Sequence, residues 1–570
     1  MARHRASVRG GAGDREGEGV IRIGNASGFY GDRLSAMREM LTGGELDVLT
    51  GDYLAELTML ILGRQRMKDP TGGYAKTFVR QLEDCLGLAV ERGVKIVTNA
   101  GGLNPAGLAQ AVRALSDKLG IEVSVAHVEG DDLLPREGAL TANAYLGAWG
   151  IAECLRAGAD IVVTGRVTDA SLVVGPAAAH FGWARDNFDA LAGATVAGHV
   201  IECGAQATGG NFSFFTEIAD LGHAGFPIAE ISEDGSSVIT KHTGTGGAVT
   251  VETVTAQLLY EIQGVDYLGP DVTTRFDTIS LASDGPDRVR ISGVRGGPPP
   301  ETVKVCVNTL DGFRNSATFV LCGLDIEAKA ALVRRQLESL IGEDGLTWTL
   351  ARTDHPDADT EEAASALLHV MVKTPDPARA KAFSRATVEL ALASYPGFTL
   401  TAPPADGTPI GVYRPEYVSP AEVEHTAVLP NGENHVLKWT EGAAVEPRSV
   451  DWTDPGTDFG PTRRVPLGSV VGARSGDKGG DANLGLWVRR PEAFDWLVRT
   501  LTVERLRSLL PETLGLDIER HLYPNLAAVN FVVHGLLGQG VAAATRFDPQ
   551  AKAFGEWLRS RHIDVPEVFL

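Results

Sequence analysis

Short apolar runs alternate with segments of helical periodicity from Val20 to Phe181, and this alternation constrains the fold more than any other feature. The predicted strands are Val20–Ile23, Leu46–Leu49, Lys95–Thr98, Ile121–Ala126 and Asp160–Val163. The predicted helices are Leu34–Leu41, about 53–67, about 74–91, Pro105–Leu119, Thr141–Ala157 and Asp169–Phe181. Such alternation is typical of parallel strands covered by helices on both faces. We therefore predict an α/β fold whose N-terminal part contains a mostly parallel sheet flanked by helices.

One more helix is predicted over about 189–203, and after Gly225 the rhythm of the sequence changes. The strands predicted here are Val303–Val307, Ala317–Leu321 and Leu367–Val372, and the helices lie near Ile326–Leu340 and Pro377–Ala393. Because strands and helices are less regularly interleaved than before, the pattern favours an α+β middle region.

The segment from Pro447 to Pro466 contains four prolines together with Asp, Gly, Thr and Arg, a composition typical of linkers. Residues 466–570 then combine strands and helices, which predicts a small α+β domain of the split βαβ, ferredoxin-like kind. The predicted parts are a disordered tail (1–19), a main region (20–446), a linker (447–465) and a C-terminal domain (466–570). The main region could form two subdomains, at about 20–225 and 226–446.

The composition favours a large, acidic, soluble protein. A net charge of −21 over 570 residues disfavours nucleic acid and anionic membranes as the main partners, because both require basic surface. Five scattered cysteines without a C-x-x-C pair indicate a reducing compartment. No apolar run reaches the length of a membrane helix, and the N-terminal residues lack the apolar core of a signal peptide. We expect a cytoplasmic protein.

Polar and glycine-rich segments follow each of the five predicted strands. In a parallel sheet the carboxyl ends of the strands lie along one edge, and ligands bind there. We therefore expect one polar rim whose glycines let a ligand approach the backbone closely. The candidate substrate-binding residues on this rim are Asn25, Ser27, Asn99, Gly101, Gly102, Asn104, Arg166 and Asp169.

Several of these residues leave two interpretations open. The glycines at 24, 28 and 31 match neither G-x-G-x-x-G nor a P-loop. They could admit a phosphate-bearing ligand such as coenzyme A, or they could only make tight turns. Arg166 could hold a carboxylate or phosphate through two hydrogen bonds, or it could pair with Asp169 and fix the loop. Asp169 could be a base or could cap the next helix.

The candidate catalytic residues are Asp52, Glu202 and His242. Asp52 lies four residues before Glu56, so the two carboxylates share one helix face, where they could transfer protons, bind a cation or only complement the helix dipole. Glu202 opens a glycine-rich turn beside Cys203, which could be a nucleophile or a small buried thiol. His242 could titrate in catalysis or serve as a hydrogen-bonding spacer.

The stretch Ser475–Asn483 contains three glycines, two aspartates and a lysine between two apolar runs. It predicts a shaped loop with exposed backbone N–H groups. Its residues Asp477, Lys478, Asp481 and Asn483 could bind an anion or a metal, or they could pair with each other or with a partner subunit. The histidines show no spacing typical of zinc ligands, so the sequence specifies no metal.

Four segments together resemble the acyclic terpene utilisation (AtuA-like) family. They are Ile23–Asp32 (IGNASGFYGD), Thr50–Glu56 (TGDYLAE), Thr98–Pro105 (TNAGGLNP) and Thr164–Asp169 (TGRVTD). The motif SGDKGGD at Ser475–Asp481 is similar to the ferredoxin-fold domain often appended to this family. The likeness spans nearly the whole chain from about Val20.

The resemblance implies a place in pathways that degrade branched, unsaturated acyl-CoA thioesters by carboxylation, hydration and carbon–carbon cleavage. The resemblance thus implies an enzyme of branched or terpenoid acyl-CoA or carboxylate catabolism. The absence of a dinucleotide fingerprint, together with the many carboxylate and amide side chains at strand ends, favours hydratase or lyase chemistry over redox chemistry. The alternative is a non-catalytic ligand-binding or assembly subunit of an acyl-CoA-processing complex. The expected ligand is an acyl-CoA or a carboxylate, a divalent cation could assist a lyase, and we expect a homo-oligomer.

Overall fold

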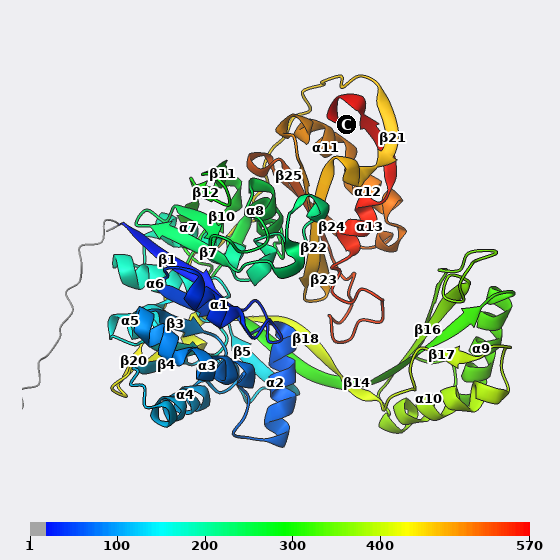
Figure 1. Ribbon diagram of the computed structural model, residues 1–570, viewed down its shortest axis with the longest axis horizontal. Helices are drawn as coiled ribbons and strands as arrows, with labels where there is room; N and C mark the ends of the chain where they lie inside the picture. Colours follow the sequence, from blue (N-terminus) through cyan, green and yellow to red (C-terminus); the bar gives the residue numbers. More distant parts are fainter. Residues whose placement is uncertain (1–18) are drawn as a thin grey trace, which may run out of the picture.

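The computed structural model describes residues 19–570, and its largest element is an eleven-stranded sheet (Figure 1). Five neighbouring strands of this sheet are parallel. In their order across the sheet they are β1 (Val20–Asn25), β2 (Val48–Gly51), β3 (Lys95–Thr98), β6 (Ile161–Thr164) and β4 (Val125–Glu129). All five strands are predicted from the alternation, although β4 begins at Val125 instead of Ile121. The tail predicted at 1–19 lies, apart from Gly19, outside the described residues.

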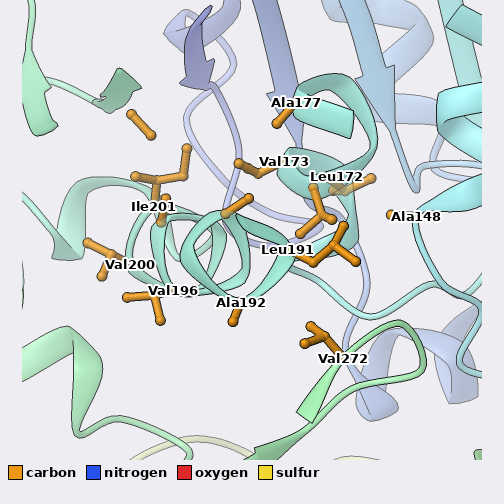
Figure 2. Close-up of a cluster of buried hydrophobic side chains, with 14 of the residues drawn as sticks. Ala148, Leu172, Val173, Ala177, Leu191, Ala192, Val196, Val200, Ile201 and Val272 are labelled. Carbon is orange, nitrogen blue, oxygen red and sulfur yellow. The ribbon is translucent and has the colours of Figure 1, made fainter. Parts of the chain in front are cut away.

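Helices cover both faces of the parallel strands. Successive strand residues point to opposite faces, so Leu49 packs into one helical layer and Val48 into the other. The first layer contains α1 (Ala36–Gly43), α3 (Lys76–Arg92) and α4 (Pro105–Leu119). The second contains α5 (Trp149–Arg156), α6 (Ser171–Phe181) and α7 (Phe188–Ile201). Figure 2 shows apolar side chains of α6 and α7 packed together in this second layer.

Antiparallel strands extend the sheet at both edges. Beyond β1 lie β7 (Pro227–Ser232), β8 (Ser237–Lys241), β12 (Val289–Ser292) and β11 (Ser280–Ser283). Beyond β4 lie β19 (Thr426–Val428) and β20 (Asn434–Val436). The prediction of a mostly parallel sheet therefore holds only for the five central strands. Because β7 pairs with β1, the sheet also runs across the subdomain boundary suggested near residue 225.

The prediction of one helix over Thr141–Ala157 is wrong. The segment contains the end of β5 (Ala139–Ala144), a turn, and α5. β5 pairs with β14 (Val303–Cys322). In the turn, Gly147 lies close to Asp271: a Cβ atom on residue 147 would stand 2.2 Å from Oδ1 of Asp271. Tertiary pairing therefore overrides the helix propensity of this alanine-rich segment.

A single strand of 20 residues, β14, replaces the two strands predicted at Val303–Val307 and Ala317–Leu321. Its first half pairs with β5 and β18 (Thr408–Val418), and its second half pairs with β16 (Ser365–Thr374) and β17 (Thr399–Leu400). Figure 1 shows that the second half leads to a lobe that stands away from the main body. The lobe also contains β15 (Leu346–Ala351), α9 (Ile326–Ile341) and α10 (Pro377–Glu389), and it has its own apolar core.

The main region also contains α2 (Glu56–Lys68), α8 (Val251–Leu258), β9 (Asp266–Leu268), β10 (Thr273–Arg275) and β13 (Arg295–Gly297). The last three form a small antiparallel sheet.

The C-terminal domain is a four-stranded antiparallel sheet covered by helices. In their order across the sheet its strands are β22 (Val471–Lys478), β23 (Asp481–Val488), β25 (Ala528–Val533) and β24 (Ile518–Tyr523). Helices α11 (Phe494–Thr500) and α12 (Val503–Leu509) connect β23 to β24, and β25 lies between those two strands. This is the predicted split βαβ unit. The edge position beside β23 is taken by β22, which precedes the unit in the chain. The domain also contains α13 (Phe554–Arg559) and the paired strands β21 (Thr462–Pro466) and β26 (His562–Pro566).

The stretch Ser475–Asn483 is a hairpin and not the irregular loop that its glycines predict. The ladder between β22 and β23 continues to the pair Lys478 and Asp481, which leaves only Gly479 and Gly480 in the turn. Gly479 has a φ of 68°, a conformation that glycine adopts without strain.

The C-terminal domain packs directly on the main region. Trp487 and Tyr523 of its sheet share one apolar cluster with Leu259 of the main region. The Tyr523 hydroxyl donates to the carbonyl oxygen of Gly264 at 2.7 Å. These contacts fix the β22–β23 hairpin relative to the main region.

Candidate functional site

A cavity of about 1100 Å³ lies between the main region and the C-terminal domain. The main region lines it with Asp52 and Arg166, which follow β2 and β6, and with Glu202, which follows α7. The C-terminal domain lines it with the tip of its first hairpin, Asp477 to Asp481. The two charged, glycine-rich parts of the sequence therefore face one space although they lie far apart in the chain.

Two buried asparagines hold the strand ends without lining the cavity. Nδ2 of Asn99 donates to Oδ1 of Asp52 at 2.6 Å, while its own Oδ1 accepts the next backbone N–H after Asp52 at 2.7 Å. Nδ2 of Asn25 donates to the carbonyl oxygens of Ile201 and Glu202 at 2.7 and 2.8 Å. The structure thus places both predicted ligand contacts one layer behind the cavity, where they position the candidate acids.

Arg166 is at the centre of the main-region side and is only 2% exposed. Its Nη1 lies 3.1 Å from Oδ1 of Asp169 and donates to the carbonyl oxygen of Leu54 at 2.9 Å, and its Cζ lies 4.3 Å from the ring centroid of Tyr145. Burial opposes the charge, but Asp169 and the other acids nearby raise the pKa of Arg166 well above its usual value. Arg166 therefore pairs with Asp169 and also borders the cavity.

Asp169 does not cap the following helix. Helix α6 begins at Ser171 after Ala170, and no side chain caps its first turn. The Asp169 carboxylate instead lines the cavity beside Arg166. The prediction that it faces a ligand site agrees with this position better than the capping interpretation does.

Three carboxyl groups face the cavity on this side: those of Asp52 and Glu202 are buried, and that of Asp169 is half-buried. Burial raises the pKa of each, and repulsion from Asp169 raises the pKa values of Asp52 and Glu202 further, while Arg166 opposes the shift in all three. Oε2 of Glu202 has no hydrogen-bond partner in the described part of the chain. Carboxyl groups with a raised pKa can keep protons near neutral pH and can donate them.

Glu56 behaves differently from this cluster. Its Oε1 accepts the Tyr145 hydroxyl at 2.6 Å and lies 3.9 Å from Nζ of Lys304. Burial disfavours its charge, but Lys304 and Arg166 outweigh burial and lower the pKa of Glu56 to about 2. An ionised carboxylate therefore lies near carboxyl groups that favour the protonated form. In enzyme sites, neighbouring carboxyl groups with different pKa values take the separate roles of acid and base.

Asp477 brings a titratable group from the C-terminal domain. Its Oδ1 lies 3.6 Å from Nζ of Lys552. Burial and repulsion from Glu261 outweigh this lysine and raise the pKa of Asp477 to about 7. A group with this pKa can both accept and donate a proton near neutral pH.

Lys478 follows Asp477 at the hairpin tip and also lines the cavity. Its charge counteracts the effect of burial on the pKa values of Asp169 and Glu202. The ammonium group therefore lies within electrostatic range of the main-region acids, and the two domains contribute to one charged site.

Glu261 lines the cavity at the domain junction with a φ of 57°, which is uncommon for a residue with a long side chain. Its backbone N–H donates to Oδ1 of Asn483 at 2.7 Å, and its Oε1 lies 3.5 Å from Nζ of Lys552. Asn483 is fully buried and also contacts Asn530. Asn483 therefore holds Glu261 and does not itself face the cavity.

Asp481 lines the cavity, but its carboxylate is already engaged. Oδ2 lies 3.0 Å from Nδ1 of His534, and Oδ1 accepts the backbone N–H of Gly535 at 2.8 Å. Burial opposes the charge of His534, but Asp481 and Glu519 outweigh burial and raise its pKa. These contacts tie the hairpin tip to the loop after β25.

Besides Asn25, Asn99 and Asn483, five more of the predicted site residues do not line the cavity: Ser27, Gly101, Gly102, Asn104 and His242. The Ser27 hydroxyl donates to the carbonyl oxygen of Phe29 at 3.0 Å, and Oδ1 of Asn104 caps α4 by accepting the N–H of Gly107 at 2.9 Å. These side chains stabilise the strand-end loops, and this position gives no support to the prediction that they bind a ligand.

The two glycines allow close packing at the end of β3. A Cβ at Gly101 would stand 2.4 Å from the carbonyl oxygen of Thr164, and a Cβ at Gly102 would stand 2.4 Å from a methyl group of Leu62. His242 packs against α1, where its Nε2 lies 2.9 Å from the carbonyl oxygen of Met40. This position gives no support to the prediction of a catalytic His242.

Cys203 lines the cavity, and burial raises the pKa of its thiol well above the usual value. Nδ1 of His199 lies 3.3 Å from Oε1 of Glu202, and burial lowers the pKa of His199 to about 4. Cys203 is half-buried, and a thiol with a raised pKa gives no support to the interpretation as a nucleophile. Within residues 19–570, no group of three or more His, Cys, Asp or Glu side chains is arranged to hold a metal ion.

Among the cavity residues that sequence reasoning missed are Tyr145, Glu261, Lys304 and Lys552. Tyr145 lies in the segment wrongly assigned to a helix. Lys304 interrupts the apolar run Val303–Val307, and a lysine at this place could have indicated a functional position. Glu261 and Lys552 carry no local signal, because only the domain contact brings them to the cavity.

These features define an α/β protein of two packed domains with a charged cavity at their junction. The chain matches the family described as acyclic terpene utilisation family protein AtuA over residues 21–429, and the AtuA ferredoxin-like domain over residues 465–564. The protein therefore belongs to the AtuA acyclic terpene utilisation family, as its motifs predict. No curated protein and no solved structure shows a significant match to the chain. Within residues 19–570, the helices are too short or too polar to cross a membrane.

Proposed function

We propose that this protein is an enzyme of branched or terpenoid acyl-CoA or carboxylate catabolism that uses hydratase or lyase chemistry. Membership of the family supports a role in terpene utilisation. One observation carries the enzymatic proposal: the carboxyl groups of Asp52, Asp169 and Glu202, whose pKa values are raised, share a cavity with ionised Glu56. Such a set of acids and bases is suited to moving protons to and from carbon and oxygen.

The size and lining of the cavity support an acyl ligand. The cavity volume of about 1100 Å³ lies just above the range of small-molecule sites, which is roughly 300–1000 Å³. The rings of Tyr145, Tyr267 and Tyr413 line it and offer apolar surface to a branched chain. In this proposal Arg166 binds the carbonyl or carboxylate oxygen nearest the reacting carbon.

The proposed hydration uses one acid and one base. A base takes a proton from water as the water oxygen bonds to Cβ of an α,β-unsaturated acyl group, and an acid gives a proton to Cα. We assign the acid to Glu202 or Asp52, whose surroundings favour the protonated form. We assign the base to Asp477, because its pKa of about 7 suits proton exchange near neutral pH.

A lyase reaction would use the same groups. The base removes the proton of a 3-hydroxyl group as the bond between Cα and Cβ breaks, and the acid protonates the carbanion that leaves.

A panel of α,β-unsaturated and 3-hydroxy acyl-CoA thioesters tests the proposal. We expect the purified protein to convert at least one branched member, with the product detected by mass spectrometry as a gain or loss of water or as two fragments. Saturable binding without turnover, together with co-purification of another enzyme, would instead favour the non-catalytic assembly subunit. We further propose that the protein is cytoplasmic and that it forms a homo-oligomer. Light scattering after size exclusion would test the oligomeric state.

A further inference from the structure

Six cationic side chains line the cavity, and five of them have an acidic partner. The paired ones are Arg166, Lys304, Arg414, Arg448 and Lys552. The sixth, Lys478, has no ion pair and no side-chain hydrogen bond within residues 19–570. A cation without a partner in a protein cavity is a ready binding site for an anionic group of a ligand.

A second cation lies close enough to Lys478 to feel its charge. Nζ of Lys304 lies 4.8 Å from the ring centroid of Tyr145 and 5.9 Å from that of Tyr413. Burial, and after it repulsion from Lys478, lowers the pKa of Lys304. Two ammonium groups that repel each other across a cavity are unfavourable in the free protein, and an anion bound between them would relieve this repulsion.

A hydrogen-bond donor lies beside the two lysines. The hydroxyl of Tyr413 is buried and has no hydrogen-bond partner among the described residues. The turn of the hairpin packs on this ring, since a Cβ at Gly479 would stand 2.8 Å from Cε1 of Tyr413. The close approach of the glycine turn thus brings Lys478 and the Tyr413 ring to the same wall of the cavity.

The charge balance favours a carboxylate over a phosphate. The ionised Glu56 lies 3.9 Å from Lys304 and offsets its charge, whereas Lys478 forms no ion pair with any residue of 19–570. A singly charged carboxylate matches this balance. A doubly charged phosphate would add excess negative charge beside Glu56 and Asp477.

We propose that Lys478, Lys304 and the Tyr413 hydroxyl form an anion subsite that binds a free carboxylate of the ligand. The ligand would then be an acyl thioester that carries a second, unesterified carboxyl group, and the C-terminal domain would supply one of its binding residues. This substrate class rests on the proposed function, whereas the subsite itself rests only on the residues that form it.

Calorimetric titration of the full-length protein with glutarate and with inorganic phosphate tests the subsite. We expect glutarate to bind with a Kd on the order of 1 mM. Lys478→Met should weaken this binding at least tenfold, and Lys478→Arg should retain it. Lys438→Met, which removes the same charge from an exposed position, should leave it unchanged. Equal affinity of Lys478→Met and wild type, tighter binding of phosphate, or no saturable binding of glutarate to wild type would each overturn the proposal.

A second measurement does not depend on any ligand. With ¹³C-methylated lysines followed by NMR, Lys478→Met should shift the titration of Lys304 to higher pH, because the repulsion between the two is removed. An unchanged Lys304 titration would contradict the proposed proximity. Glutarate binding that depends on Lys478 without turnover of any thioester would uphold the subsite and refute the proposed function. Thioester turnover in a protein that does not bind glutarate would uphold the proposed function and refute the subsite.

Discussion

The two sides of the cavity differ in how a central cation is held. On the main-region side Asn99 holds Asp52, and the cation Arg166 pairs with Asp169. On the C-terminal side the hairpin tip presents Lys478, which has no such partner in the part of the chain that the structure describes. Polar residues at strand ends therefore stabilise the site as much as they form it. A group that is free to bind a ligand can be recognised because it lacks an ion-pair or hydrogen-bond partner within the protein.

Arg166→Ala should have the largest effect, because it removes the cation shared by the interior acids. Breaking a buried charge network costs about 3–5 kcal/mol. We expect the free energy of unfolding in urea to fall by this amount. Arg385→Ala is the matched control, since its side chain is 85% exposed and its pair with Glu389 contributes less than about 1 kcal/mol. Equal losses in both variants would show that the main-region side is not interlocked.

Glu202→Gln should separate catalysis from stability. Gln has the shape of the protonated carboxyl group that burial and Asp169 favour at this position, so we expect little change in the free energy of unfolding. Because Gln cannot donate the proton, kcat on a converted thioester should fall about 100-fold, or about 2.7 kcal/mol in activation free energy. An unchanged kcat would remove Glu202 from the proposed mechanism.

Asp477→Asn tests the hairpin side through pH. The folded-state pKa of about 7 lies above the ordinary value of 3.8, so the folded protein binds this proton more tightly than the unfolded chain does. The resulting stability is present below about pH 4 and is lost as the pH rises to about 7. The variant should reduce the downward slope of unfolding free energy against pH in this window by up to about 1.4 kcal/mol per pH unit. The same slope in variant and wild type would contradict the raised pKa.

His242→Gln should have the smallest effect on function. The ring contacts the Met40 carbonyl and does not line the cavity, so we expect a loss of about 1 kcal/mol in unfolding free energy and an unchanged kcat. A large fall in kcat with normal stability would restore the catalytic interpretation and would place the reacting atoms outside the cavity.

The parallel core and its polar rim could be predicted because a parallel sheet places successive strand ends on one edge. Asp52 and Arg166 follow different strands, and both line the cavity as this rule requires. The roles of Asn25 and Asn99 could not be predicted, because an amide that holds a neighbouring acid and an amide that faces a ligand look the same in sequence. Only the buried hydrogen bonds distinguish them.

The C-terminal side was less predictable for two physical reasons. Gly476, Gly479 and Gly480 interrupt the alternation that marks a strand, so the hairpin resembles a loop in sequence. The cavity wall also depends on contacts between distant segments: Glu261 and Lys304 come from the main region and meet the hairpin only after the domains pack. Local patterns do not record such contacts.

A crystal structure of the protein with a thioester that it binds is the most direct measurement. We expect electron density for the ligand inside the cavity at the domain junction. The reacting end of the ligand should lie beside Arg166 and Glu202, and an anionic group should lie at Lys478. Ligand density elsewhere on the molecule, with this cavity filled only by solvent, would contradict the idea that the two domains build one site.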